Sequence, residues 1–330
     1  MNIKYSSLYP ILCFFLIFLC LPHSSVSERC NKNDKRVLLQ IKKALNNPYV
    51  IISWNPEGDC CEWSLVKCDE KTNRVITLYI EDDNNLTGQI PPQVADLPYL
   101  ETLWFRKLPK LTGSIPTAIS SLANLKSVRI SWTNVTGPVP VFFAQLKNLT
   151  YLDLSFNKLT GSIPPQLSTL PNLEALFLDR NQLTGGIPDS FGKFPASPDI
   201  YLSHNQLTGL VPKTFAGSNP FRIDLSRNKL QGDISFFFGS KKRLEIADFS
   251  RNKFSFDFSK VKQFPPNLIY LDLNHNQITG SLPGALTKIR LQTFNVSYNR
   301  LCGKIPTGAN LNIFDYFHNR CLCGTPLPKC

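Results

Sequence analysis

Aspartate recurs at one position of a repeating apolar motif, and regularly spaced carboxylates raise the question of acid–base chemistry. Each of these aspartates stands between two apolar residues of a short LxL-like triplet. Glycoside hydrolysis is the reaction that uses two opposed carboxyl groups. A repeated position on an open, solvated face, however, lacks the buried pocket that would shift a carboxyl pKa, so the pattern favours binding over catalysis. The aspartates are Asp153, Asp224, Asp248 and Asp272.

Other catalytic side chains are scarce or poorly placed. The chain has four histidines, and His204 and His275 each directly precede a repeated asparagine, where a solvated surface position is expected. No P-loop, GxSxG, HExxH or Rossmann glycine pattern occurs in a suitable context. The sequence therefore predicts a protein that is not an enzyme and that needs no cofactor and no metal.

Aromatic residues and arginines occupy the outward positions around the aspartates on successive repeats. One exposed aromatic residue is common on any surface, but aromatic residues beside arginines on consecutive repeats are typical of a protein-binding hot spot. The arginines can pair with carboxylates of a partner and the aspartates with its basic groups. The predicted contact residues are Trp104, Arg129, Trp132, Asp153, Phe156, Phe177, Arg180, Tyr201, His204, Asp224, Arg227, Asp248 and Arg251.

A repeat of the form LxxLxLxxNxLxGxIP must position these side chains. Its asparagines are 23 or 24 residues apart, threonine replaces asparagine at Thr133, and two earlier turns carry one extra residue. This gives ten turns of about 24 residues between residues 69 and 301. The repeated asparagines are Asn157, Asn181, Asn205, Asn228, Asn252, Asn276 and Asn299.

Each part of the repeat predicts local structure. Leucines of the LxL triplet point inward from a short strand while the residue between them points outward. Because the leucines of one turn cannot form a core alone, the turns must stack. The asparagine amide is suited to bonding the backbone groups of the bend, and the proline of GxIP suits a 3₁₀ or irregular segment. The fold class is therefore an α/β leucine-rich-repeat solenoid, with a concave parallel sheet and convex 3₁₀ or irregular segments.

Cysteines mark the two ends of the solenoid, as expected for caps that cover its apolar ends. An even number of cysteines in two clusters indicates disulfides in an oxidising compartment, whereas the spacing fits a zinc site poorly. Four cysteines allow three pairings per cluster; we favour Cys30–Cys60, Cys61–Cys68, Cys302–Cys321 and Cys323–Cys330. The N-terminal cap, residues 28–68, is also expected to hold a helix from Asp34 to Leu45 with Asp34 as its N-cap. The C-terminal cap covers residues 302–330.

The first 27 residues have the pattern of a secretory signal peptide. Lys4 precedes an apolar run from Ile11 to Leu21, and small residues follow at Ser25 and Ser27. The run falls short of the roughly 20 residues that a membrane-spanning helix needs. We therefore predict cleavage after Ser27, secretion, and no membrane anchor in the mature chain.

Net charge and sequons add two further expectations. The chain carries 36 basic and 24 acidic residues, a net charge of +12, which favours an acidic partner. In a secreted chain nucleic acid is an improbable partner, while weak, salt-dependent binding to acidic cell-wall pectin is expected. N-glycosylation sequons stand at Asn85, Asn134, Asn148 and Asn295.

The complete chain resembles plant polygalacturonase-inhibiting proteins. The resemblance is carried by residues 59–63 (DCCEW), the LxGxIP repeat, and the cysteine-containing segments 302–306 (CGKIP) and 321–330 (CLCGTPLPKC). Residues 103–109 and 199–205 also look like the carrot antifreeze branch of this family. The repeat alone is less specific, because ectodomains of plant receptor kinases share it.

The resemblance implies a glycoprotein of the plant cell wall and apoplast that acts in defence. Such a protein inhibits endopolygalacturonases secreted by fungi or insects, limiting pectin degradation, when its concave face covers or rims their substrate cleft. The antifreeze branch supplies the alternative, an ice-recrystallisation inhibitor of the same fold. The irregularly placed arginines and aspartates of the outward face favour a protein partner over an ice lattice.

Overall fold

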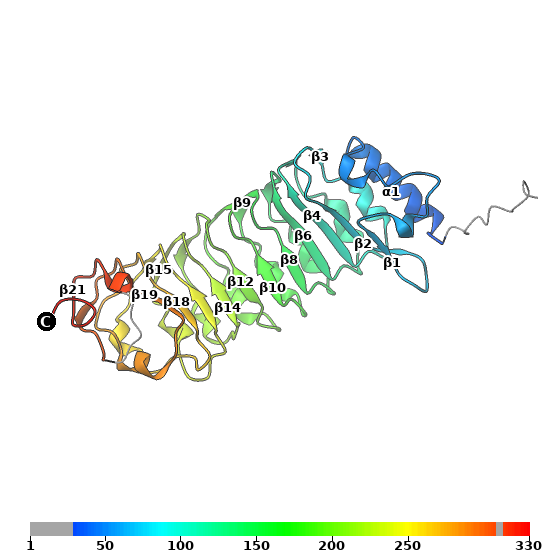
Figure 1. Ribbon diagram of the computed structural model, residues 1–330. Coiled ribbons are helices and arrows are strands. Elements are labelled where there is room, and N and C mark those ends of the chain that lie inside the picture. Colours follow the sequence, from blue (N-terminus) through cyan, green and yellow to red (C-terminus); the bar gives the residue numbers. More distant parts are fainter. Residues whose placement is uncertain (1–28, 308–312) are drawn as a thin grey trace, which may run out of the picture.

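The computed structural model describes residues 29–307 and 313–330, so the predicted signal peptide, residues 1–27, lies outside the described residues. The chain forms an elongated stack of turns whose strands lie side by side along one face (Figure 1). This is the predicted solenoid, with the N-terminal cap at one end and the C-terminal cap at the other. No helix in these two ranges is long and apolar enough to cross a membrane.

The main sheet contributes one strand per turn. Strands β2 to β19 pair in parallel, while β1 adds to the N-terminal edge in antiparallel orientation, which the repeat did not predict. Its strands are β1 (Val66–Cys68), β2 (Val75–Glu81), β4 (Thr102–Leu108), β6 (Ser127–Thr133), β8 (Tyr151–Asp153), β10 (Ala175–Phe177), β12 (Asp199–Tyr201), β14 (Arg222–Asp224), β16 (Ile246–Asp248), β18 (Tyr270–Asp272) and β19 (Thr293–Asn295).

Short flanking strands follow most of the main strands, at or near the LxG part of the repeat, and one further such strand lies in the C-terminal cap. They form small parallel sheets beside the main one. These strands are β3 (Thr87–Gln89), β5 (Lys110–Thr112), β7 (Thr136–Pro138), β9 (Lys158–Ser162), β11 (Gln182–Thr184), β13 (Thr208–Leu210), β15 (Lys229–Gly232), β17 (Lys253–Phe254), β20 (Cys302–Lys304) and β21 (Cys321–Cys323).

The convex side consists of short 3₁₀ segments, most of which start at the proline of the repeat or just after it. Proline fixes φ and lacks an N–H donor, so it suits the start of such a segment and prevents a long helix. In the caps and repeats the segments are η2 (Tyr49–Ile51), η3 (Cys60–Glu62), η4 (Pro92–Asp96), η5 (Thr117–Ser121), η6 (Val141–Gln145), η7 (Pro165–Thr169), η8 (Asp189–Lys193), η9 (Lys213–Ala216), η10 (Ser235–Phe237), η11 (Phe258–Lys260), η12 (Gly284–Lys288) and η13 (Ile313–Tyr316).

The core is a continuous column of apolar side chains between the sheet and the convex segments. Both inner leucines of a turn, such as Leu176 and Leu178, are fully buried, and so is the leucine of the flanking strand, such as Leu183. Each turn shares these contacts with its neighbours, which confirms that burial is achieved by stacking.

The repeated asparagines form a hydrogen-bonded ladder through the stack. Asn205 donates from Nδ2 to the carbonyl oxygens of Leu202 (3.1 Å) and Ser203 (3.2 Å) in its own turn. It also donates to Leu178 O in the preceding turn (2.9 Å) and accepts from Leu183 N–H (2.9 Å). Each asparagine thereby satisfies backbone groups that the tight bend leaves without partners.

The ladder extends one rung beyond the last predicted turn. Asn319 donates to the carbonyl oxygens of Val296 (3.0 Å) and Tyr316 (2.9 Å) and accepts from Leu301 N–H (3.1 Å). It stands only 20 residues after Asn299 and lacks the LxGxIP sequence around it, so the periodicity did not reveal it. The C-terminal cap is therefore partly an additional, shortened turn.

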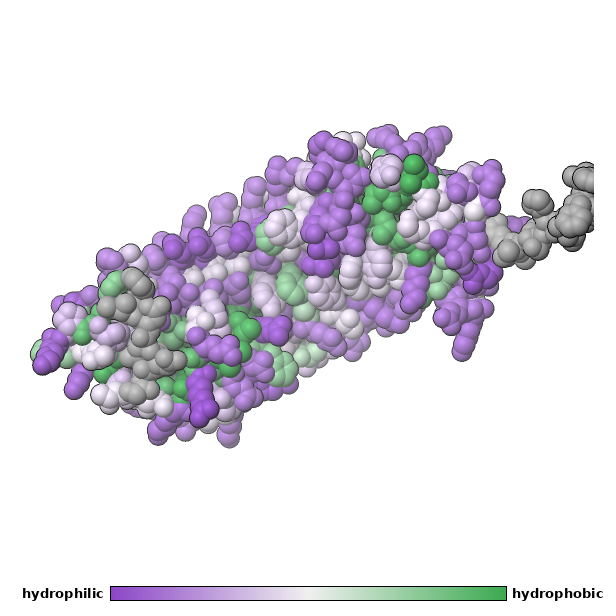
Figure 2. Space-filling model, in the orientation of Figure 1, coloured by the Kyte–Doolittle hydropathy of each residue, from purple (hydrophilic) through white to green (hydrophobic). Residues whose placement is uncertain are grey.

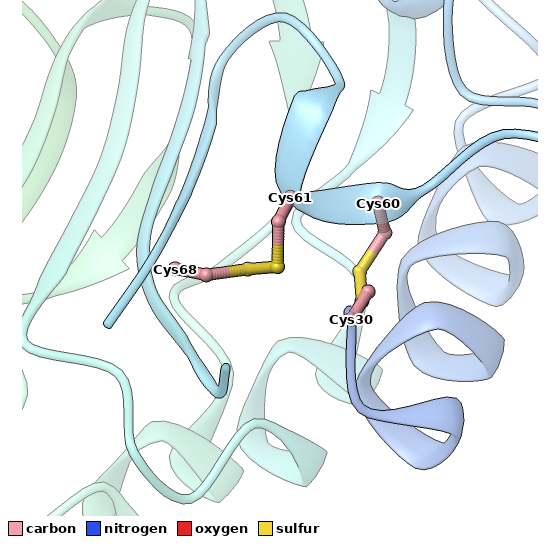
Figure 3. Close-up of side chains that lie close together, drawn as sticks. All are labelled: Cys30, Cys60, Cys61 and Cys68. Carbon is pink, nitrogen blue, oxygen red and sulfur yellow. A yellow bond between two sulfur atoms is a disulfide. The ribbon is translucent and has the colours of Figure 1, made fainter. Parts of the chain in front are cut away.

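Both caps contain the predicted disulfides: Cys30–Cys60, Cys61–Cys68, Cys302–Cys321 and Cys323–Cys330. Figure 3 shows how adjacent Cys60 and Cys61 reach in different directions, to the segment before the helix and to β1. The four sulfur atoms of this cap lie within 4.8 Å of one another. Because they are paired, they offer no thiolate ligands for a metal ion.

The cap helix α1 spans Lys32–Ala44, and its predicted N-cap was wrong. Asn31 is the N-cap and accepts from the backbone N–H groups of Asn33 and Asp34. Asp34 lies within the first turn, is 1% exposed, and accepts a bidentate bond from Arg74 (2.8 and 2.9 Å) as well as one from Val75 N–H. Its role is therefore to join α1 to β2, a contact between residues about 40 apart that helix-capping rules do not address.

Candidate functional site

The outward residues of the main sheet form one row across all ten predicted turns. Strand register aligns Trp104 with Arg129 and Phe177 with Tyr201, and the same register continues along the sheet. The row therefore has the order predicted from the repeat: Tyr79, Trp104, Arg129, Asp153, Phe177, Tyr201, Asp224, Asp248, Asp272 and Asn295.

A second row, which we call the rim, consists of the residue directly before each rung of the asparagine ladder. All of its members have φ between 52° and 58°, a left-handed conformation that non-glycine residues seldom adopt. Backbone hydrogen bonds to the next turn hold them there, as from Arg180 N–H to Ser203 O (2.8 Å). The rim residues are Trp132, Phe156, Arg180, His204, Arg227, Arg251, His275, Tyr298 and His318.

The N-terminal part of the site is aromatic. The rings of Tyr79 and Trp104 lie 4.7 Å apart, and Trp132 stacks on Phe156 at 3.6 Å. The guanidinium of Arg180 then lies over the Phe156 ring at 4.9 Å. Trp132 is 49% exposed, so part of this stack is available for contact with a partner.

A second aromatic group lies in the middle of the row. Phe177 stacks on Tyr201 at 4.5 Å and also contacts Tyr151 at 5.3 Å. Tyr151 directly precedes the inner leucine Leu152 and does not lie between two inner leucines. For this reason it was not among the contact residues predicted from the sequence. Phe177 and Tyr201 are half-buried, which limits their freedom and reduces the entropy that binding would cost.

Arg129 and Asp153 bond to each other rather than facing a partner separately. Arg129 Nε lies 2.7 Å from Asp153 Oδ2, and Asp153 is only 1% exposed. Asp153 also accepts from the backbone N–H and hydroxyl of Ser155. The prediction that Asp153 meets basic groups of a partner is therefore wrong, because its carboxylate lies beneath the surface. Arg129 remains half-exposed and keeps donors for contact.

The C-terminal half of the row is acidic and its carboxyl groups are more buried than predicted. Asp224, Asp248 and Asp272 stand on adjacent strands in register, about 4.8 Å apart. Burial raises the pKa of Asp248, and burial raises that of Asp272 to about 6. The expectation that an open face lacks the burial needed to shift a carboxyl pKa was thus wrong for Asp248 and Asp272, because burial disfavours the charged form of both groups.

Asp179 shows the largest such shift, and the sequence reasoning missed it. It stands after the second inner leucine, where neighbouring turns have a small buried serine such as Ser155 or Ser203. Burial, with the nearby negative charges of Asp153 and Asp224, raises the pKa of Asp179 to about 7, while Arg180 opposes the shift. The sequence did contain a signal for this residue: an aspartate stands at a repeat position that holds a serine in both neighbouring turns.

Removing the Asp179 carboxyl group should flatten the dependence of stability on pH. Because its folded-state pKa is raised from 3.8 to about 7, the stabilisation from protonation is complete below about 3.8 and is lost as pH rises through about 7. We expect Asp179→Asn to gain less thermal stability than the wild type when the pH is lowered from 7.5 to 5. Scanning calorimetry at both pH values measures this.

The pH dependence of Asp179→Asn must be compared with that of a control variant, because His204 and His275 change the stability with pH in the opposite direction. Burial and nearby arginines lower the pKa of both histidines, which disfavours the folded state as pH falls below about 6.5. The matched control is Asp96→Asn, at an exposed carboxyl group on η4. An Asp179→Asn variant with the same pH dependence as this control would contradict the assignment.

The sequons differ in accessibility. Asn85 and Asn148 are exposed, whereas Asn134 and Asn295 are half-buried. Asn134 donates to Pro109 O (2.6 Å), and Asn295, in the outward row, accepts from the hydroxyl and N–H of Ser297. Glycans at Asn85 and Asn148 would leave the outward row uncovered.

This fold and its two outward rows define a leucine-rich repeat protein. The description "Leucine rich repeat N-terminal domain" matches residues 31–69, and the leucine-rich repeat descriptions match residues 123–183 and 267–289. The matched residues belong to the N-terminal cap and to parts of the stacked turns described above.

Comparison with known proteins identifies the family. The chain is 63% identical to a polygalacturonase inhibitor of Vitis vinifera, over 94% of this chain and 93% of the relative. It is 61% identical to polygalacturonase inhibitor 1 of Arabidopsis thaliana, over 97% and 98%. The chain belongs to the polygalacturonase-inhibitor family of leucine-rich repeat proteins.

A solved structure described as an ice-binding protein is about as similar to this chain as these two relatives are. The crystal structure of a plant ice-binding protein has a TM-score of 0.91 and 66% sequence identity, covering 92% of this chain and 98% of that chain. Relatives of similar identity are therefore described by two different properties, polygalacturonase inhibition and ice binding. The surface residues of this chain bear on which of the two applies to it.

Proposed function

We propose that this protein is a secreted, non-catalytic inhibitor that binds endopolygalacturonases of fungi or insects through the outward row and the rim. The observation that carries the proposal is the continuous register of the row, which places Trp104, Phe177 and Tyr201 on one face. Rigid, half-buried aromatic groups are the usual anchors of a protein interface. Family membership supplies the class of partner.

Charge arrangement supports a protein partner with regions of both signs. Arg180, Arg227 and Arg251 are exposed on the rim, while Asp224 and Asp248 lie in the row beside them. A partner would have to present carboxylates to the rim and basic groups to the row. Such complementarity mainly sets specificity and association rate.

Inhibition is tested directly by titrating the purified protein against several fungal and insect endopolygalacturonases while following the release of reducing ends. We expect stoichiometric loss of activity with at least one enzyme. The absence of inhibition across the whole panel, with correctly folded protein, would reject the proposal. Reducing-end release by the protein alone would reject its non-catalytic character.

Ice binding is a second candidate, because one flank carries a regular row of threonines that the sequence reasoning overlooked. Six consecutive turns expose a threonine from their flanking strands. Neighbouring flanking strands are offset by two residues, so that Thr160 pairs with Pro138 and Gln182. A two-residue offset keeps side chains on the same face. The row is Thr87, Thr112, Thr136, Thr160, Thr184 and Thr208.

This threonine row makes a specific prediction about ice. Thr136→Tyr with Thr184→Tyr should weaken inhibition of ice recrystallisation several-fold, because bulky rings interrupt a row of small hydroxyl and methyl groups. Splat-cooling assays measure the effect. The matched control pair, Thr150→Tyr with Glu174→Tyr, lies directly before two main strands and outside the threonine row. It should leave the inhibition of ice recrystallisation unchanged. Equal effects of the two pairs, or no activity in the wild type, would exclude the threonine row as an ice-binding surface.

A further inference from the structure

The segment after α1 exposes apolar side chains at the N-terminal end of the molecule. Tyr49 in η2 is 81% exposed, and Ile52, directly after η2, is 63% exposed. At this end of the molecule, Figure 2 shows an apolar patch bordered by hydrophilic side chains. One exposed apolar side chain is ordinary, but several together beside a hollow indicate a surface that something else covers.

A hollow of about 580 Å³, which we call the cap hollow, separates this segment from the loop after β2. Its volume lies in the range of sites for small molecules. Carboxylates in its lining accept hydrogen bonds from hydroxyl groups and would repel a polyanion. A neutral, hydroxyl-rich ligand with apolar faces therefore suits it. Apolar groups of the lining come from Tyr49, Val50 and Leu86, and polar groups from Asp83 and Asn85.

Asn85 lies in the wall of the cap hollow and begins the sequon Asn85-Leu86-Thr87. Asp83 Oδ1 accepts from the backbone N–H groups of Asn85 (2.7 Å) and Leu86 (3.0 Å), which fixes the loop. Asn85 Oδ1 accepts from Lys110 Nζ (3.4 Å). Its Nδ2, the atom that bears an N-linked glycan, donates no hydrogen bond within the part of the chain that the structure describes.

The other three sequons lack this combination of exposure and a free amide nitrogen. Asn134 and Asn148 donate from Nδ2 to backbone carbonyl oxygens of the preceding turn, at 2.6 and 2.9 Å. Asn295 is half-buried. Because a glycan replaces one hydrogen of Nδ2, Asn85 can carry one without competition from an internal hydrogen bond.

We propose that Asn85 carries an N-linked glycan whose first two N-acetylglucosamine rings occupy the cap hollow and stack on Tyr49. The C–H face of a sugar ring packs on an exposed aromatic ring, while sugar hydroxyls donate to the carboxylate of Asp83. The glycan is tethered at the wall of its own site, so its effective concentration there is high. It covers apolar surface that would otherwise favour self-association.

Attachment is a group transfer from an oligosaccharide linked to a lipid diphosphate, the donor that the secretory pathway supplies. Asn85 Nδ2 forms a bond to C1 of the first sugar and releases one proton. The bond between C1 and the diphosphate oxygen breaks, and the lipid diphosphate leaves with the electron pair. The proposal therefore rests on the proposed secretion of the chain, but it does not require that the protein inhibit any enzyme.

The test measures how well the fold protects this glycan. The mature chain is secreted from plant cells treated with kifunensine, which keeps N-glycans in the high-mannose form. Native protein is then digested with endoglycosidase H, which cuts between the first two N-acetylglucosamine rings. Mass spectrometry of the tryptic peptide 75–106, in which Asn85 begins the one sequon, gives both the occupancy and the rate of cleavage.

Three variants isolate the role of the Tyr49 ring. Tyr49→Ala removes the ring, Tyr49→Phe keeps it without the hydroxyl group, and Phe221→Ala removes an exposed aromatic side chain elsewhere. Tyr49 is so exposed that its replacement should leave the fold intact, which thermal unfolding checks. Reduced and denatured samples give the rate of cleavage without any protection by the fold.

We expect the Asn85 glycan to be present, and to be cleaved about fivefold faster in Tyr49→Ala than in the wild type, as the loss of one ring stack would cause. Tyr49→Phe and Phe221→Ala should match the wild type, and all four proteins should be cleaved equally fast when denatured. An unmodified Asn85, or equal native rates in wild type and Tyr49→Ala, would overturn the proposal. Either result would leave the inhibitor proposal standing, since that is tested by reducing-end release.

Discussion

Replacing Trp104 and Phe177 together by alanine is expected to weaken inhibition of endopolygalacturonase by at least about 100-fold. Trp104 is packed between Tyr79 and Arg129, and its Nε1 donates to Ser127 Oγ (3.0 Å). These contacts hold the ring in place before a partner arrives, which reduces the entropic cost of binding.

Phe177 has an equivalent position in the next aromatic group. It lies between Tyr151 and Tyr201 and is aligned with Asp153 on the neighbouring strand. Since Trp104 and Phe177 are three turns apart and share no contact partner, their effects should be nearly additive. Each aromatic anchor of this kind contributes about 2 kcal/mol or more to binding.

The measurement is the inhibition constant against the most sensitive enzyme of the panel, with thermal unfolding as a check on the fold. The control pair is Tyr49→Ala with Phe221→Ala, two exposed aromatic residues outside the row and the rim. Inhibition that survives the Trp104 and Phe177 changes, in a folded protein, would show that the row is not the anchor of the interface.

Substitution of one ladder asparagine is expected to have the largest effect on stability. Asn205→Ala removes three donated bonds and leaves the buried Leu183 N–H without its acceptor. An unsatisfied buried donor and several lost hydrogen bonds together should cost about 3 to 5 kcal/mol. The rigid bend that places His204 at φ 53° would loosen at the same time.

Guanidinium unfolding followed by tryptophan fluorescence, with the disulfides intact, measures this loss. Asn172→Ala is the control, because Asn172 is exposed and makes a single side-chain bond, to Lys147 O at 3.2 Å. The control should shift the free energy of unfolding by no more than about 0.5 kcal/mol. Similar unfolding midpoints for both variants would mean that the ladder is not a major source of stability.

These two experiments separate the scaffold from the surface. Loss of the ladder should reduce inhibition only through loss of structure, whereas loss of the aromatic anchors should reduce inhibition in a protein of nearly normal stability. The two experiments therefore test whether folding and the proposed enzyme binding depend on distinct residues.

The sequence by itself determined the fold and the order of the outward row, whereas it left the disulfide pairing as a preference among three possibilities per cluster. It could do so because stacking repeats have one dominant periodicity: the LxL triplet fixes which side chains point outward, and parallel strands preserve that order from turn to turn. The structure decided among those pairings: Cys61 pairs with Cys68, 7 residues away, but Cys30 pairs with Cys60 across 30 residues.

Only the tertiary structure decided how exposed and how charged each outward group is. Asp153 has the same position in the repeat as Asp224, yet it is buried against Arg129, and Asp179 acquires a raised pKa from neighbours on other turns. The Asp34–Arg74 pair and the short rung at Asn319 likewise depend on contacts between turns. Burial and ionisation are properties of an environment built by many residues, so the repeat pattern of one turn cannot specify them.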